Sequence, residues 1–107
     1  MQNSIFAMYE KLWLLTRQML DAAQRDDWDT LIEVELMRDT LVEHIASYDG
    51  LSDMTEIERQ KTSELIQRIL VADEEIQALT VIWMDELQEM LGSIGTEKKL
   101  HKAYETP

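Results

Sequence analysis

The chain has 107 residues, 45% of them hydrophobic and 30% charged, and its 22 acidic residues outnumber 10 basic ones to give a formal net charge of -12. That length accommodates one small domain, and the acidic balance disfavours direct binding to a nucleic-acid backbone. Because the chain has no cysteine, a disulfide framework and a thiolate metal site are both excluded.

The first predicted element is a helix over residues 4–25. Its apolar residues recur at alternating spacings of three and four, which places them in one stripe along a helix, and Ser4 is placed to cap its start. This stripe consists of Ile5, Met8, Leu12, Leu15, Met19 and Ala22. Residues 1–9 carry no charged side chain but are too few for a secretory signal or a membrane span, so we expect a cytoplasmic protein without membrane insertion.

A second helix is predicted over residues 27–48, after an acidic turn in which Asp26 or Asp27 serves as the N-cap. Its apolar residues cover more than half of the helix circumference. A helix with so wide an apolar surface either packs on two sides or offers one side to a partner.

A third helix is predicted over residues 55–92. Thr55, followed three residues later by Glu58, matches a capping box at its start. At about 1.5 Å per residue the helix would be about 60 Å long, which is longer than either of the other two. One end of it must therefore project or be covered by another segment. Its main apolar stripe consists of Leu65, Ile69, Ala72, Ile76, Leu79, Trp83, Leu87, Met90 and Ile94.

The two glycines Gly92 and Gly95 are expected to end the third helix, and a short helix follows over residues 96–104. The tail, residues 96–107, holds three lysines against two glutamates, unlike the acidic remainder of the chain. Such a basic end is expected to dock on the acidic body or to meet an acidic partner. Together these elements predict an all-α fold, an antiparallel three-helix bundle with a long third helix plus a short C-terminal helix, in one domain over residues 1–107.

The chain lacks the residue patterns that catalysis or metal binding would need. Di-iron helical bundles require inward Glu-x-x-His pairs on two helices, and that motif does not occur, so His44 and His101 are expected in structural or solvated roles. There is also no Gly-x-Ser-x-Gly turn and no phosphate-binding glycine loop. We therefore expect no enzyme activity, no metal and no cofactor. Glu35 is interpreted as an edge residue paired with Arg17 or Arg38, in preference to a buried acid.

The surplus of apolar helix surface favours binding of another protein's amphipathic helix, and three short motifs add a family resemblance. These motifs are Met19-Leu20-x-x-Ala23-x-x-Asp26-Asp27-Trp28-Asp29-x-x-Ile32-x-x-Glu35, Trp83-x-Asp85-Glu86-Leu87 and Lys98-Lys99-Leu100-x-x-Ala103-Tyr104. Over nearly its whole length the chain resembles the FliT-type flagellar export chaperones. The family usually has a glycine where this chain has Asp26.

The resemblance implies a cytoplasmic type III export chaperone that binds the filament-cap protein FliD and delivers it to the export ATPase FliI and its partner FliJ. In enteric relatives the family also restrains the flagellar regulator FlhDC. Two alternatives stay open. In one the chain is mainly an anti-activator that binds FlhDC and so represses transcription, and in the other it is a structural protein that homodimerises through its apolar surface.

For the client-binding surface, the sequence favours the flank of the third helix beside its main stripe, together with part of the second helix. Apolar residues there lie outside the stripe that fills the core, so a partner is expected to bury them; the alternative is that they complete the core. The client-binding candidates are Leu36, Met37, Ile66, Leu70, Val81 and Met84. In the tail, the resemblance implies that Lys98, Lys99 and Tyr104 belong to a movable last helix that limits access to other partners.

Overall fold

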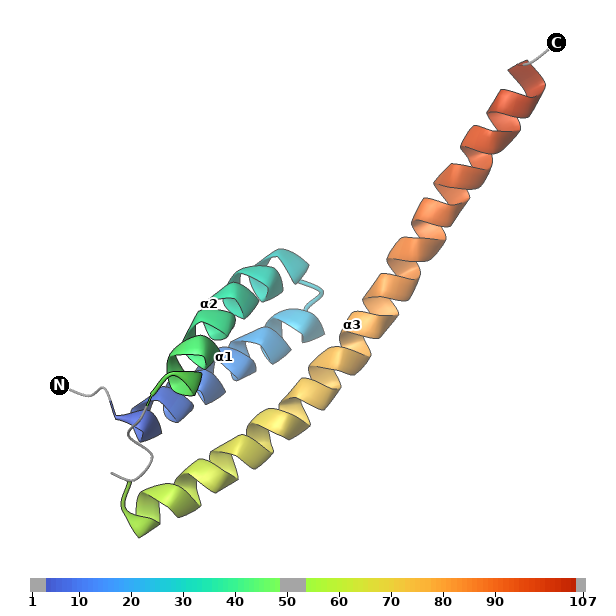
Figure 1. Ribbon diagram of the computed structural model, residues 1–107. Coiled ribbons are helices and arrows are strands. Elements are labelled where there is room, and N and C mark those ends of the chain that lie inside the picture. Colours follow the sequence, from blue (N-terminus) through green and yellow to red (C-terminus); the bar gives the residue numbers. More distant parts are fainter. Residues whose placement is uncertain (1–3, 49–53, 106–107) are drawn as a thin grey trace. The chain divides into compact units, whose positions relative to one another are not determined.

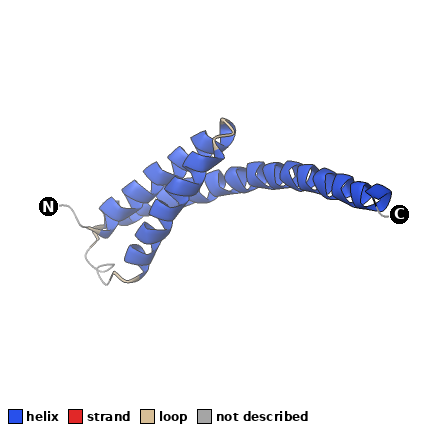
Figure 2. Ribbon diagram, turned by 90° about the horizontal axis from the view of Figure 1, so that it is seen from above, coloured by secondary structure: helices blue, strands red, loops and turns tan. Residues whose placement is uncertain are grey.

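The computed structural model describes residues 4–48 and 54–105 of the chain, with side chains described as far as residue 92 (Figure 1). These residues form three helices, α1 (Ile5–Gln24), α2 (Trp28–Ala46) and α3 (Glu56–Glu105). Figure 2 shows helices and no strand in the described ranges. The all-α prediction is therefore confirmed. None of the described helices is long and apolar enough to cross a membrane.

Contacts within the chain divide it into two compact units, Met1–Gln77 and Ala78–Pro107. The first unit contains α1, α2 and the beginning of α3, and the second contains the remainder of α3. The single domain predicted over residues 1–107 stays a prediction.

Helix α1 begins and buries its residues as its sequence predicts. The Oγ atom of Ser4 accepts a hydrogen bond of 3.1 Å from the backbone N–H of Ala7, which confirms the expected N-cap. Of the six residues in the predicted stripe, only Met8 is not fully buried. Thr16, a polar neighbour of the stripe, is 0% exposed, and its hydroxyl donates to the carbonyl of Leu12 at 2.8 Å.

The corner between α1 and α2 is built from local hydrogen bonds. The N–H of Asp26 donates to the carbonyl of Ala23 at 3.2 Å, and the N–H of Asp27 donates to the carbonyl of Ala22 at 2.8 Å. This pair of bonds is a Schellman motif, which requires a left-handed residue, and Asp26 has a φ of 56°. Asp27 then caps α2 by accepting bonds from the N–H and the hydroxyl of Thr30 at 3.3 and 2.7 Å. Asp27 is therefore the cap among the two expected candidates.

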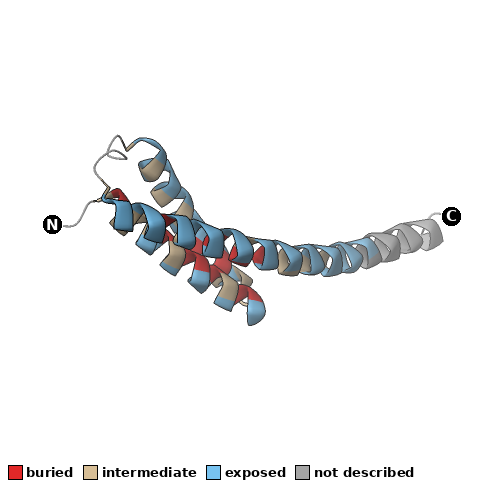
Figure 3. Cartoon of the chain, turned by 90° about the horizontal axis from the view of Figure 1, so that it is seen from below, coloured by how far each residue is buried: buried red, intermediate tan, exposed pale blue. Residues whose placement is uncertain are grey.

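The core of the first unit lies where α1, α2 and the beginning of α3 meet (Figure 3). In this unit α2 runs antiparallel to both α1 and the start of α3 (Figure 1). Besides α1, the buried apolar side chains come from Leu31 and Val34 of α2 and from Ile69, Ala72 and Ile76 of α3. Burial of this apolar surface supplies the main stabilisation of the unit.

A polar network joins all three helices of the first unit. The guanidinium of Arg38 on α2 donates one hydrogen bond to Thr16 of α1 at 3.2 Å and another to the carboxylate of Asp73 on α3. A second bond, from the Gln24 side-chain amide to the Glu75 carboxylate at 3.2 Å, also links α1 with α3. These bonds fix which face of α3 meets α1 and α2.

The preference for an edge position of Glu35 over a buried acid is confirmed, but its predicted pairing with Arg17 or Arg38 is wrong. Arg38 pairs with Asp73, and Arg17 lies over the ring of Trp13, with its guanidinium carbon 6.0 Å from the ring centroid. Glu35 itself is exposed, because it lies outside the buried stripe of α2. Position in an apolar stretch did not reveal which side chain each arginine would meet.

Helix α3 starts with the predicted capping box and continues further than predicted. The N–H of Thr55 donates to the Glu58 carboxylate at 3.0 Å, and the N–H of Glu58 donates to the Thr55 hydroxyl at 3.1 Å. The predicted end at Gly92 and Gly95 is wrong, since α3 runs without a break to Glu105. A glycine inside a helix costs only about 1 kcal/mol relative to alanine, and the surrounding Leu, Met, Glu and Lys residues favour helix.

Candidate functional site

All six candidate client-binding residues are exposed, so none of them completes the core. The exposed fraction ranges from 36% for Ile66 to 65% for Leu36. Their role in binding stays a prediction. The main stripe of α3 is also less buried than expected beyond Ile76, because Leu79, Trp83 and Leu87 are half-buried and Met90 is 63% exposed.

The candidates belong to different surfaces. On α2, Leu36 and Met37 are adjacent in sequence and therefore point about 100° apart, and Met37 alone faces α1. On α3, Ile66 and Leu70 are four residues apart and share one face of the first unit. Val81 and Met84 form a similar pair, three residues apart, in the second unit.

Val42 of α2 is another exposed apolar residue, at 46% exposure. The ion pair between Arg38 and Asp73 fixes the register of the two antiparallel helices. Val42 follows Arg38 by about one turn and Leu70 precedes Asp73 by about one turn, so we infer that Val42 lies on the side of α2 nearer to Leu70. We call Val42, Ile66 and Leu70 the α2·α3 strip. Val42 could not be singled out from the sequence, because only the way in which α2 and α3 meet distinguishes it from the other apolar residues of α2.

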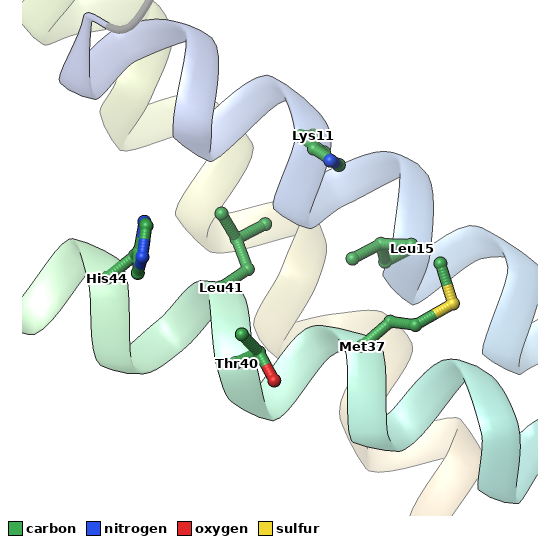
Figure 4. Close-up of a pocket in the computed structure, with 6 residues that line it drawn as sticks. All are labelled: Lys11, Leu15, Met37, Thr40, Leu41 and His44. Carbon is green, nitrogen blue, oxygen red and sulfur yellow. The ribbon is translucent and has the colours of Figure 1, made fainter.

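A second apolar surface, an open hollow of about 370 Å³, lies between α1 and α2 (Figure 4). In Figure 4 the side chains of Leu41 and His44 extend from α2 toward α1, and Leu15 of α1 lies opposite Met37. We call this surface the α1·α2 groove. Its lining residues are Lys11, Leu15, Met37, Thr40, Leu41 and His44.

The remaining expectations concern the tail and metal ligands. The side chains of Lys98, Lys99 and Tyr104 lie outside the described residues, and so does that of His101, although the helix backbone continues through them. Within the described ranges no group of three or more His, Asp and Glu side chains is placed to hold a metal ion.

Comparisons with known proteins give a consistent family assignment. The model of a family described as "Flagellar protein FliT" matches residues 6–106. Proteins named flagellar protein FliT from Serratia proteamaculans and Photorhabdus laumondii are each 28% identical, over 96% and 94% of this chain and 84% and 80% of their own lengths. The relative of that name from Cronobacter sakazakii is 30% identical over 90% of this chain and 79% of its own length. No solved structure shows significant similarity to the chain.

Proposed function

Because this chain belongs to the FliT family of flagellar proteins, we propose that it is a cytoplasmic export chaperone that binds the filament-cap protein FliD. The family membership supports a flagellar role. The exposed apolar side chains on α2 and α3 support binding of a helical client. In this proposal the client is held unassembled until it reaches the export apparatus.

The observation that carries the proposal is the α2·α3 strip. Ile66 and Leu70 are exposed while their neighbours Ile69, Ala72 and Ile76 are each 7% exposed or less. The first unit therefore has a buried core that does not need the strip. An exposed row of apolar side chains beside a finished core is typical of a protein interaction site, and an amphipathic client helix would cover it with its apolar face.

Replacing Leu70 by Asp tests the strip directly. Leu70 is 57% exposed, so Leu70→Asp should leave helicity and melting temperature close to those of the wild type. Affinity for a C-terminal fragment of FliD should fall about tenfold or more, because one buried apolar anchor is worth about 1 to 3 kcal/mol. Isothermal titration calorimetry measures the affinity, and circular dichroism checks the fold.

Gln18→Asp is the matched control, since it adds the same charge at an exposed polar position of α1, in the first unit but outside the strip. This control should bind the fragment as the wild type does. Val81→Asp applies the same test to the second unit. If both Leu70→Asp and Val81→Asp bind the fragment normally, the client surface lies elsewhere, and a chain that binds FlhDC but not FliD would be an anti-activator instead.

We further propose that the chain delivers its client to FliI and FliJ and that residues 96–107 limit this step. The three lysines of this tail distinguish it from the acidic remainder of the chain and suit reversible docking. Deleting residues 96–107, or replacing Tyr104 by Ala, should strengthen binding to FliI and FliJ in pull-down assays. Unchanged or weaker binding in both variants would mean that the tail has no such role or is itself the contact surface.

A further inference from the structure

The α1·α2 groove is separate from the proposed client surface. Met37 in the groove and Val42 in the α2·α3 strip are five residues apart on α2, which places them about 140° apart around the helix axis. A helix that covers the strip would therefore leave the groove open. The groove also lies wholly within the first unit, between two helices that are consecutive in the chain.

The floor of the groove is apolar and its edges are basic. Leu15 is 3% exposed and forms the floor, Leu41 is half-buried, and the flexible side chain of Met37 is 55% exposed. Lys11 of α1 and His44 of α2 supply basic groups, and neither makes an ion pair within the described ranges of the chain. Among the described residues that line the groove none is acidic, although acidic residues outnumber basic ones by 22 to 10 in the chain.

We propose that the α1·α2 groove binds a short amphipathic segment of a partner protein that inserts a bulky apolar side chain and places a carboxylate beside Lys11 and His44. Charge complementarity selects the carboxylate, because ammonium and imidazole groups both donate hydrogen bonds to carboxylate oxygens. Methionine adapts to apolar side chains of different shape, which suits Met37 to the inserted group. A partner protein that already binds the α2·α3 strip would gain a second contact at this groove.

The size and charge of the groove favour such a segment over a second copy of the chain. A volume of about 370 Å³ is near the lower end of the range of about 300 to 1,000 Å³ for ligand pockets, which suits one or two inserted side chains. A second copy would bring its own formal charge of -12 close to an equally charged body. That repulsion opposes self-association, whereas a short segment carries its charge only at the contact.

Two synthetic peptides test the charge selection. One is a fluorescein-labelled helical peptide of about 14 residues with a Leu and Phe stripe flanked by Glu, and the other has Gln in place of each Glu. Fluorescence anisotropy with the full chain at low salt should show the Glu peptide binding about three to ten times more tightly. Equal affinities of the two peptides would overturn the proposal.

Variants locate the contact. In the double variant Lys11→Gln, His44→Gln the preference for the Glu peptide should disappear, while Lys61→Gln, Arg68→Gln on the exposed surface of α3 should keep it. Met37→Asp, at an exposed position, should weaken binding of the Glu peptide by about tenfold, through loss of one anchor and addition of a like charge. If both double variants lose the preference equally, the preference depends on the overall charge of the protein and not on this groove, which would contradict the proposal.

NMR and sedimentation distinguish the other occupants. On adding the Glu peptide, methyl resonances of Met37 and Leu41 should shift, and those of Ile66 and Leu70 should not. Shifts confined to Ile66 and Leu70, or a dimer that buries Met37 in the absence of peptide, would contradict the proposal. Leu70→Asp should bind the Glu peptide as the wild type does. The FliD experiment therefore tests the α2·α3 strip alone, and the peptide experiment tests the α1·α2 groove alone.

Discussion

Asp26 occupies a backbone conformation that favours glycine. Its φ of 56° costs an ordinary residue about 1 to 2 kcal/mol, and less for Asp, whose short side chain bonds locally. We expect Asp26→Gly to raise the free energy of unfolding by about 0.5 to 1 kcal/mol, measured by urea denaturation. Asp21→Gly, at an exposed helical position of α1, should lower it by about 0.5 kcal/mol, through lower helix propensity and loss of the exposed ion pair with Arg25. A destabilising Asp26→Gly would show that the aspartate side chain itself stabilises the corner.

The N-cap of α2 predicts an acid-sensitive contribution to stability. The hydrogen bond from the Thr30 hydroxyl, with a weaker contribution from the Thr30 N–H, lowers the pKa of Asp27 from its ordinary value of 3.8. A carboxyl whose pKa is lower in the folded chain stabilises the fold fully above the unfolded value. This contribution is therefore expected to disappear as the pH falls from 3.8 through the lower folded pKa.

The measurement is urea unfolding at a series of pH values between neutral and strongly acidic. Asp27→Asn retains an oxygen acceptor for the cap but cannot titrate. The variant should lack the part of the pH dependence that belongs to Asp27. Identical slopes for the wild type and the variant below pH 3.8 would contradict the assignment.

At the scale of elements, the polar network helps to hold α3 against α1 and α2. The Arg38 and Asp73 side chains are 19% and 36% exposed, so part of their attraction is screened by water. A double-mutant cycle with Arg38→Ala and Asp73→Ala should give a coupling energy of about 1 kcal/mol. The same cycle on Arg25 and Asp21, which are 58% and 64% exposed, should give less than about 0.5 kcal/mol. Equal couplings would mean that the network does not contribute to seating α3.

Continuity of α3 through Gly92 gives a further prediction. A Cβ atom at Gly92 would meet nothing within 4 Å, and its φ is not positive. Gly92→Ala should therefore increase helicity by circular dichroism and stabilise the helix by about 0.5 to 1 kcal/mol. A helix that ended at Gly92 in a left-handed conformation would instead be destabilised by this substitution. A loss of helicity would therefore favour the separate tail helix that the sequence predicted.

Local patterns predicted the elements, and contacts between elements decided the rest. Ser4 and the Thr55–Glu58 pair could be assigned from sequence, and the cap of α2 could be narrowed to Asp26 or Asp27, because a cap depends on residues within one turn of it. Exposure of Ile66 and Leu70 followed from their offset from the main stripe. The partner of Arg38 and the position of Val42 could not be predicted, because both depend on which faces of distant helices meet.

At the scale of the whole molecule, every buried apolar residue within the described side chains lies between Ile5 and Ile76. A chain truncated after Gln77 should therefore fold, with a free energy of unfolding within about 1 kcal/mol of the full chain. Urea unfolding followed by circular dichroism checks this. A large loss of stability would show that Ala78–Pro107 belongs to the same cooperative unit, as the prediction of one domain over residues 1–107 requires.

The hydrogen-bonded corner at Asp26 and Asp27 also has a kinetic consequence. The corner closes α1 onto α2 with bonds that span only a few residues, so this hairpin loses little chain entropy when it forms. The bond between Arg38 and Asp73 spans 35 residues and must wait for a longer loop to close. We therefore expect the hairpin to form before α3 docks on it, so a substitution that weakens the contact with α3 should speed unfolding without changing the rate of hairpin formation.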